Sequence, residues 1–431
     1  MNAPAATNEG LPVAVIGAGP VGLAAAAQLA GRHQAFVLLE SGPRPGSAVA
    51  EWGHVTFFSP WRYVVADGAR QLLEATGWSM PDPDRDPTGR ELIDRYLVPL
   101  AAHPAIAPHL RFGSRVVSVT RQGMDRVPSK GREARPFEIV TSSPDGRETR
   151  YLARAVIDAS GTWSRPNPAG ASGVPAVGER AAAARITYSI PDVFGSKKPR
   201  FAGRRVMVIG SGHSAMDSIL SLTRLKNEEP ATEILWAMRS MPTERTFGGL
   251  DDDQLASRGA LGERSKAAVD RGEVQLIAPF RVTEFQLTEE AVVVTGETHR
   301  GHEIISVDEV IVATGFRPDF TALSELRLDL HPWLESPRAL GPLIDPNEHS
   351  CGTVPPHGEG ELKHPEQGVY IVGMKSYGRA PTFLMITGYE QVRSVVAALS
   401  GDWAAAQDAR LVLPETGVCH GPGTAAAYCE S

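Results

Sequence analysis

The sequence predicts an α/β protein with two Rossmann-like domains, and two observations support this fold class. A glycine-rich motif of the form G-x-G-x-x-G, or its alanine variant, occurs at residues 17–22 and again at 210–215. Each copy follows a short apolar run rich in β-branched residues and precedes a segment with helical character. Strand, tight turn and helix in this order are typical of the first βαβ unit of a Rossmann domain. A chain of 431 residues has room for two or three domains.

Composition is typical of a soluble globular protein. Hydrophobic residues make up 42% of the chain, charged residues 22%, and the net charge is −7, so there is no basic footprint for nucleic acid. Residues 1–10 lack the charged and apolar regions of a signal peptide, and we expect a disordered lead-in and a cytoplasmic protein. The longest apolar run, residues 23–30, is too short for a membrane helix of about 20 residues. We therefore expect neither nucleic-acid nor membrane partners.

The first glycine motif has the features of a dinucleotide-binding loop. A strand is expected over Val13–Ile16 and a helix from the end of the motif to about Ala30. Gly17 permits the tight turn, Gly19 allows the backbone to approach a pyrophosphate, and Gly22 allows close contact between helix and strand. The phosphates then face the positive end of the helix dipole.

Glu40 extends this prediction to the ribose. It ends the next expected strand, residues 35–39, and lies 18 residues after Gly22. A carboxylate at this spacing binds ribose hydroxyls and would repel a 2′-phosphate, which favours FAD or NAD over NADP. The candidate residues of this loop are Gly17, Gly19, Pro20, Gly22 and Glu40.

The second glycine motif differs from the first in the residue that follows its next strand. The strand expected over residues 233–238 ends in Arg239 rather than in an acid. A guanidinium there can pair with a 2′-phosphate and stack on the adenine, which predicts NADPH. The alternative is that Arg239 only begins a solvated loop. His213 is expected to line the pyrophosphate or pack nearby rather than act as a base. The candidate residues of this loop are Gly210, Gly212, His213, Ser214 and Arg239.

Two further segments resemble the two-dinucleotide-binding flavoproteins, and within them the flavin-containing, class B type monooxygenases. Residues 155–163, AVIDASGTW, resemble the segment where such chains leave the FAD domain, and residues 309–318, EVIVATGFRP, resemble the segment where they return. Both are apolar strands that end in small residues, so that backbone can lie against a cofactor. The resemblance covers residues 11–400. The monooxygenase fingerprint F-x-G-x-x-x-H-x-x-x-[FYW] is not intact, because residues 184–194 read ARITYSIPDVF.

The resemblance implies an FAD domain with an inserted NADPH domain. The expected division is a lead-in at 1–10, FAD-binding parts at 11–175 and 306–400, an NAD(P)H-binding domain at 176–305, and a C-terminal tail at 401–431. The N-terminal loop then binds FAD. The N-terminus of a helix expected over residues 382–399 would stabilise negative charge on the reduced flavin. Further cofactor-binding candidates that the resemblance implies are Gly161, Thr314, Gly315, Gly373 and Thr382.

The substrate side is expected to involve two other segments. Residues 51–63, EWGHVTFFSPWRY, are dense in aromatic side chains, and the resemblance places them beside the flavin. Here Trp61 is a candidate for a flavin contact, and Arg62 is a catalytic candidate, since a buried guanidinium could hold an anion there. The alternatives are an aromatic core and a surface salt bridge. The substrate-side candidates are His54, Phe58, Cys351, Lys375, Tyr377 and Arg379.

The function that the resemblance implies is an FAD- and NADPH-dependent monooxygenase. It would transfer one oxygen atom from O2 to a small-molecule substrate through a C4a-(hydro)peroxyflavin. The alternatives are an NAD(P)H-dependent flavoprotein reductase that serves a quinone, a disulfide or a carrier, and a non-enzymatic redox sensor. None of the cysteines, Cys351, Cys419 and Cys429, forms a C-x-x-C pair, and no standard metal-ligand spacing occurs. A homodimer is one assembly that the sequence allows.

Overall fold

The computed structural model describes residues 8, 10–248, 255–348, 354–381 and 383–408. The chain divides into two compact units. Among the described residues, unit 1 contains those up to Ser164 and those from Arg317 onward, and unit 2 contains Arg165–Phe316. Unit 2 is therefore an insertion in unit 1, as expected, although both of its boundaries differ from the expected 176–305.

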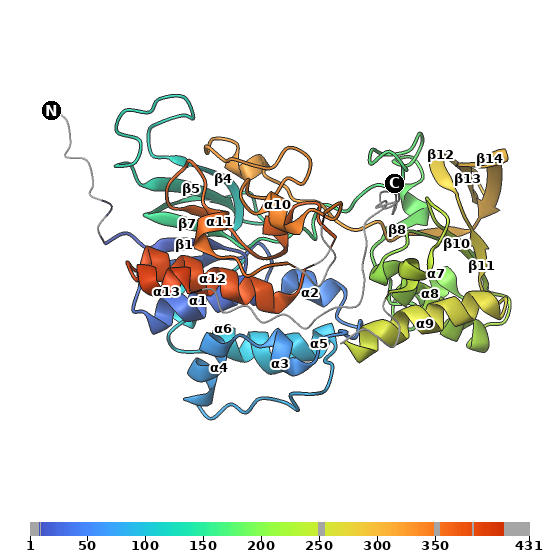
Figure 1. Ribbon diagram of the computed structural model, residues 1–431, viewed down its shortest axis with the longest axis horizontal. Helices are drawn as coiled ribbons and strands as arrows, with labels where there is room; N and C mark the ends of the chain where they lie inside the picture. The colour runs from blue at the N-terminus through green and yellow to red at the C-terminus, as the bar shows by residue number, and fades with distance from the viewer. Residues whose placement is uncertain (1–7, 9, 249–254, 349–353, 382, 409–431) are drawn as a thin grey trace, which may run out of the picture. The chain divides into compact units, whose positions relative to one another are not determined.

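Unit 1 is built on a five-stranded parallel sheet (Figure 1). The sheet is buried because its strands are continuous apolar runs, as in VAVI at residues 13–16 and FVLL at 36–39. All four strand pairs are parallel, so the carboxyl ends of the strands meet at one edge. The strand order is β16 (Val369–Ile371), β7 (Ala155–Asp158), β1 (Val13–Ile16), β2 (Phe36–Leu39) and β3 (Leu110–Arg111).

Two long helices of unit 1 pack against each other, and Figure 1 shows them side by side. They are α1 (Pro20–Gly31) and α12 (Met385–Leu399), which confirms the helix expected near residues 382–399. The run of alanines at 24–27 in α1 is buried, and small side chains allow this close contact. The other helices of unit 1 are α2 (Ser47–Glu51), α3 (Trp61–Val64), α4 (Asp67–Glu74), α5 (Gly89–Leu92), η1 (Ile93–Leu97), α6 (Val98–Ala102), η2 (Ala107–His109), η6 (Thr321–Leu323), α10 (Gly341–Ile344), α11 (Glu359–Leu362), η7 (Gly373–Tyr377) and α13 (Trp403–Gln407).

The helical segment that starts at α5 begins with a capping box. The Thr88 side chain accepts a hydrogen bond from the N–H of Glu91, whose carboxylate accepts one from the N–H of Thr88. A hydrogen bond from Arg85 lowers the pKa of Glu91 to about 2. The helix then continues through the π-helical turn η1 into α6, with the apolar face buried.

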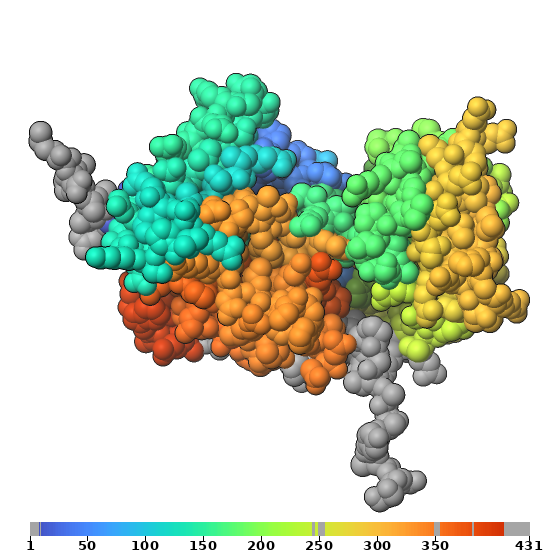
Figure 2. Space-filling view, turned by 90° about the horizontal axis from the view of Figure 1, so that it is seen from above, coloured from blue at the N-terminus to red at the C-terminus, as the bar shows by residue number. Residues whose placement is uncertain are grey.

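Unit 1 also contains a three-stranded antiparallel sheet, made of β4 (Arg115–Arg121), β5 (Phe137–Ser142) and β6 (Glu148–Ala153). This sheet contacts the segment that re-enters unit 1 after residue 316, where β4 packs on η6. In Figure 2 the teal atoms of the sheet and the orange atoms of residues 317–345 adjoin in one continuous surface.

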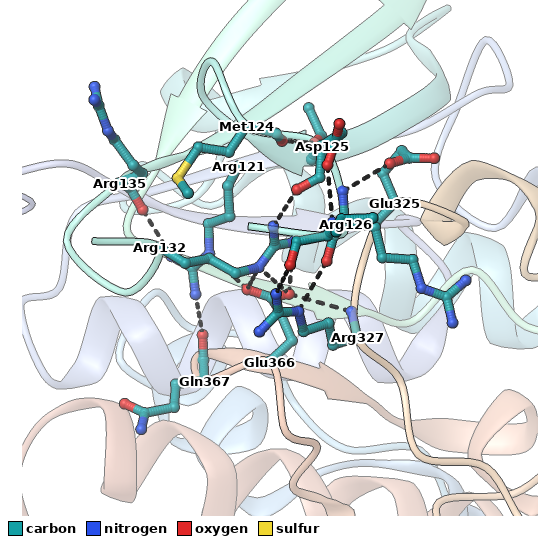
Figure 3. A network of polar contacts seen from close by, with 12 residues as sticks. Arg121, Met124, Asp125, Arg126, Arg132, Arg135, Glu325, Arg327, Glu366 and Gln367 are labelled. Atoms are coloured by element: carbon teal, nitrogen blue, oxygen red, sulfur yellow. Dashed lines mark hydrogen bonds and ion pairs between the residues drawn. The ribbon is translucent and has the colours of Figure 1, made fainter. Parts of the chain in front are cut away.

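A buried network of charged side chains holds these segments together (Figure 3). The carboxylate of Glu366 accepts hydrogen bonds from Arg121 at 2.8 Å, from Arg132 at 2.9 Å and from the backbone N–H of Arg327 at 3.1 Å. The guanidinium of Arg121 also stacks on the ring of Phe137, 3.7 Å from its centroid. One carboxylate thus links β4, the 122–136 loop, the re-entry segment and the chain before β16.

Unit 2 has its own five-stranded parallel sheet and a three-stranded antiparallel sheet. Strand β15, which we expected in the second FAD-binding part, pairs instead with β9 and β8 in unit 2. The expectation was wrong because an apolar strand before a glycine does not by itself reveal its partners. The elements of unit 2 are η3 (Ala183–Arg185), β8 (Ile186–Tyr188), α7 (Lys198–Phe201), β9 (Arg205–Ile209), α8 (His213–Glu228), β10 (Glu233–Ala237), η4 (Glu244–Phe247), α9 (Ala256–Asp270), β11 (Gln275–Ile277), β12 (Arg281–Leu287), β13 (Val292–Thr298), β14 (Gly301–Val307) and β15 (Glu309–Val312).

In the described part of the chain, no helix combines the length and the apolar character that a membrane span requires.

Candidate functional site

The first glycine loop connects β1 to α1 in unit 1. Gly17 has a φ of +96°, which side chains disfavour, and its N–H donates to the carbonyl of Leu39 at 2.7 Å. A Cβ on Gly17 would lie 2.9 Å from the carbonyl oxygen of Ala159, and one on Gly22 would overlap the carbonyl oxygen of Gly17. At Gly19, the N-cap of α1, no atom lies within 4 Å of such a Cβ.

This contrast is what a pyrophosphate requires. Two of the glycines let backbone pack on backbone, while Gly19 leaves open space in front of the positive end of α1. Pro20 occupies the first helical position, where a missing N–H has no cost. The loop therefore fits the diphosphate of a dinucleotide.

Glu40 lies directly after β2, beside this loop. One of its carboxylate oxygens accepts a hydrogen bond from the N–H of Ala18, and the other accepts one from the N–H of Gly42, both at 2.7 Å. The carboxylate is buried and joins the glycine loop to the next turn. The oxygen bonded to Gly42 also accepts a hydrogen bond from the Ser41 hydroxyl at 3.4 Å, whereas Ala18 is the one donor described for the other oxygen. The expected contact with a ribose hydroxyl stays a prediction that this second oxygen allows.

The second glycine loop repeats this geometry between β9 and α8 in unit 2. Gly210 has a φ of +134°, and a Cβ there would overlap the carbonyl oxygen of Ala313. Gly212 is the N-cap of α8, with no atom within 4 Å of its would-be Cβ. Ala215 in the third position is buried, so its methyl group fits between helix and strand. This loop also fits a diphosphate.

Thr314 and Gly315 follow β15 and therefore lie next to the second loop, in unit 2. The Thr314 hydroxyl donates to the carbonyl of Asn167 at 3.0 Å, and the Asn167 side chain donates to the carbonyl of Thr314 at 3.0 Å. Gly315 has a φ of +87°. These hydrogen bonds join the segment by which the chain enters unit 2, near residue 165, to the segment by which it leaves, near residue 316.

Arg239, His213 and Ser214 lie at the same edge of the unit 2 sheet. Arg239 follows β10, the strand next to β9, and its side chain is exposed, with one long hydrogen bond of 3.5 Å to the carbonyl of Ala171. His213 and Ser214 are the first two residues of α8 and are half-buried. Arg239 is thus placed beyond the loop on the side where the adenosine ribose of a dinucleotide lies in Rossmann domains.

The structure corrects the expectations for Trp61 and Arg62. Trp61 is 0% exposed and packs within the hydrophobic core of unit 1, so it borders no open space that a cofactor could fill. Arg62 is exposed, forms an ion pair with Asp84 and stacks over the Tyr63 ring. The buried guanidinium that we expected near a flavin is absent at this position. His54 is exposed and Phe58 is half-buried, so aromatic density alone did not distinguish core from surface.

The segment after β16 also differs from the expectation of a polar substrate wall. Lys375 is 4% exposed, and its ammonium forms an ion pair with Asp158 at 2.6 Å. Tyr377 is buried against Phe383, and burial raises the pKa of its hydroxyl. Arg379 is exposed and paired with Glu335 at 2.7 Å. Lys375 and Tyr377 are therefore interior groups, and their expected contact with substrate is wrong.

Gly373 and the helix behind it form a polar contact in the interior. Gly373 has a φ of +70°, and its N–H donates to the side-chain oxygen of Gln391 on α12 at 2.8 Å. The Gln391 amide also contacts the ring of the buried His357 at 3.1 Å. Thr382, expected at the start of α12, lies outside the described residues, as do Cys351, Cys419 and Cys429.

The histidines of the loop before β16 are separate interior groups. His357 contacts the carbonyl of Pro355 at 3.1 Å, while His364 accepts a hydrogen bond from the N–H of Asp329 at 3.2 Å. Burial lowers the pKa of both side chains, that of His364 to about 4. Within the described ranges, no group of three or more potential ligands is arranged for a metal ion.

Asp158 lies opposite Ile16, directly before the first glycine loop, and was not among the site residues predicted from the sequence. It ends β7, and one of its oxygens accepts hydrogen bonds from the N–H of Ser160 at 3.0 Å and from the Ser160 hydroxyl at 2.6 Å. Gly161 follows with a φ of +69° and open space around it. An acid at the end of an otherwise apolar buried strand was the available signal, since such a group requires a partner.

The chain matches one family over most of its length. A sequence profile described as pyridine nucleotide-disulphide oxidoreductase matches residues 14–348. A ferredoxin–NADP reductase of Thermus thermophilus is 23% identical over 310 residues, which cover 70% of this chain and 72% of that protein.

Solved structures with the same fold include reductases and monooxygenases. The bacillithiol disulfide reductase Bdr of Bacillus cereus superposes with a TM-score of 0.66 and 19% identity, covering 91% of this chain and 99% of that one. A flavin-containing monooxygenase of Stenotrophomonas maltophilia gives a TM-score of 0.55 and 23% identity, covering 91% and 98%. At these identities the likeness shows the shared fold.

Proposed function

We propose that this chain, which belongs to the pyridine nucleotide-disulphide oxidoreductase family, is an FAD- and NADPH-dependent monooxygenase that acts on a small molecule. Members of this family use FAD and NAD(P)H, and this chain is an FAD-dependent oxidoreductase of that type. The proposed reaction consumes NADPH, a proton, O2 and the substrate, and it yields NADP⁺, water and the oxygenated substrate.

The observation that carries the proposal is the presence of two dinucleotide loops without a C-x-x-C pair anywhere in the sequence. Two loops provide for an electron donor and an electron acceptor. A reductase that relays electrons through its own vicinal dithiol needs two adjacent cysteines. The three cysteines here do not offer that motif, which argues against such a relay and in favour of an acceptor that reacts with the reduced flavin directly, as oxygen does.

The residues of each loop have separate tasks in this proposal. In unit 1, the open N-terminus of α1 at Gly19 would bind the FAD diphosphate, and Glu40 would bind its ribose. In unit 2, the N-terminus of α8 at Gly212 would bind the NADPH diphosphate. When bound, FAD accepts a hydride and passes electrons to oxygen, chemistry that side chains do not supply. The protein binds, orients and shields the reactants.

A second candidate is a reductase that serves an external carrier. The similarity to a ferredoxin–NADP reductase over 70% of the chain favours it, because such an enzyme needs the two loops but no cysteines of its own. The two candidates differ only in the final acceptor.

Oxygen and carrier assays on the purified flavoprotein separate the two candidates. For a monooxygenase we expect one NADPH to be oxidised per O2 consumed, with an atom from isotope-labelled O2 in the product of a screened substrate. Rapid anaerobic reduction of a ferredoxin or a quinone, together with slow oxygen use and no labelled product, would instead establish the reductase. Absence of NADPH turnover with every acceptor would leave only the redox sensor.

Arg239→Ala tests the choice of NADPH. We expect KM for NADPH to rise about tenfold or more while KM for NADH stays within about twofold, since the exposed guanidinium would pair only with a 2′-phosphate. Arg271→Ala is the matched control, because Arg271 is an exposed arginine of unit 2 that pairs with Glu273. Equal increases of both KM values in Arg239→Ala would contradict the assignment.

A further inference from the structure

The Lys375–Asp158 ion pair is buried at the edge of the sheet that holds the first dinucleotide loop. The Lys375 ammonium lies 2.6 Å from one oxygen of Asp158 and 3.1 Å from the hydroxyl of Ser160. Lys375 is 4% exposed and Asp158 2%. The ammonium also lies over the Phe320 ring, 5.3 Å from its centroid. Charges are kept in such a place only when they are paired.

Strand order brings this pair next to the loop. Asp158 is the last residue of β7 and lies opposite Ile16 of β1 on one side and Ile371 of β16 on the other. Lys375 belongs to η7, the turn that follows β16. The ammonium therefore reaches across the carboxyl edge of the sheet to the strand between β16 and β1.

The turn that Asp158 begins forms one wall of the first loop. The N–H of Ala159 donates to the carbonyl of Ile16 at 2.9 Å, and a Cβ on Gly17 would lie 2.9 Å from the carbonyl oxygen of Ala159 and 3.1 Å from the Cα of Ser160. Ser160 in turn donates to Asp158 and accepts from Lys375. The ion pair and the loop are thus separated by a single layer of backbone.

The charges at this edge would conflict without the lysine. A bound diphosphate brings negative charge to the N-terminus of α1, and Glu40 is a second buried carboxylate beside the same loop. An unpaired carboxylate at Asp158 would repel the diphosphate, and a buried interaction of this kind is little screened by salt. The positive charge of Lys375 cancels that of Asp158.

We propose that Lys375 is a positioning residue for FAD, which neutralises Asp158 and so keeps the wall of the first dinucleotide loop compatible with the diphosphate. The proposal rests on the assignment of FAD to this loop. It does not depend on whether oxygen or a carrier accepts the electrons. Lys375 acts through Asp158 and Ser160, in contrast to the direct substrate contact that the sequence suggested.

A charge cycle with apoprotein and added FAD tests this role. Lys375→Met keeps the length of the side chain and removes the charge, and we expect the Kd for FAD to rise about tenfold or more. Asp158→Asn/Lys375→Met removes both charges while an amide oxygen still accepts the Ser160 bonds, and we expect a Kd within about threefold of wild type. Asp158→Asn alone leaves the ammonium and should bind FAD as tightly as wild type or more tightly.

The outcomes separate this role from loss of structure. Glu366→Gln is the control, since it perturbs another buried ion pair of unit 1 and should lower the unfolding midpoint without changing the Kd for FAD. The proposal is overturned if the double variant binds FAD as weakly as Lys375→Met, which would mean direct contact by Lys375. It is also overturned if Asp158→Asn alone weakens binding to the same extent. A wild-type apoprotein that binds no FAD would instead refute the proposed function.

Discussion

Gly22→Ala is expected to abolish FAD binding and to lower the free energy of unfolding by about 3 kcal/mol. A methyl group there would overlap the carbonyl oxygen of Gly17, which is backbone and has no rotamer by which to move away. Either α1 or the Gly17 turn must therefore shift, and both position the diphosphate. The ratio of flavin to protein absorbance after purification and the urea unfolding midpoint measure the two effects.

Two glycines of the same segment provide matched controls. In Gly31→Ala, at the end of α1, the added methyl group would have no neighbour within 4 Å. We expect no measurable loss of stability or of FAD content in this variant. Gly19→Ala also meets no protein atom, but its methyl would occupy the space in front of the helix N-terminus. We expect Gly19→Ala to fold normally and to bind FAD more weakly. Full flavin content in Gly22→Ala would contradict the assignment of this loop.

Glu366→Ala is expected to destabilise the protein by about 3–5 kcal/mol, because it leaves the guanidinium groups of Arg121 and Arg132 buried without their shared carboxylate. The Arg327 N–H loses its acceptor as well. Figure 3 shows that these groups converge on the one carboxylate from different segments of unit 1. Urea denaturation followed by circular dichroism measures the change.

The effect of Glu366→Ala should depend on pH. Burial alone would raise the pKa of Glu366, but hydrogen bonds from Arg132 and Arg121 outweigh it and hold the pKa below its usual range. The carboxylate therefore contributes its full stability at pH values above the ordinary glutamate pKa. This contribution is lost as the pH falls through the lower pKa that Glu366 has in the folded protein. The difference between wild type and variant should shrink accordingly in acid.

A surface ion pair of the same unit provides the comparison for Glu366→Ala. The exposed Arg150 of β6 pairs with Glu138 of β5 at 3.4 Å, and Arg150→Ala should cost less than about 0.5 kcal/mol. A loss of similar size in Glu366→Ala would show that the buried network contributes little to folding.

Both dinucleotide loops could be predicted from the sequence because their determinants are local. Gly17 and Gly22 lie within six residues of each other, and their backbone requirements act inside one strand–turn–helix unit. Glu40 could be placed because it ends the same βαβ unit, with only α1 and β2 between it and the loop, and its carboxylate accepts a hydrogen bond from the N–H of Ala18. The capping box at Thr88 was likewise readable from four residues.

Residues whose role depends on long-range contacts could not be placed in this way. Trp61 and Arg62 are adjacent in one aromatic segment, yet the first is in the core and the second pairs with Asp84 at the surface. Strand β15 resembled a return to unit 1 but pairs with β9 in unit 2. Composition and spacing carry no information on which strand a given strand meets.

The sequence by itself determined the two Rossmann units, their glycine loops and the acid and the arginine that follow the second strands, since these depend on residues close in the chain. Only the tertiary structure decided that Lys375 is an interior partner of Asp158, 217 residues away in sequence. It also decided that the carboxylate of Glu366 forms ion pairs with both Arg121 and Arg132. A buried charge is stable only with a partner, and the partner is chosen by strand order and chain re-entry.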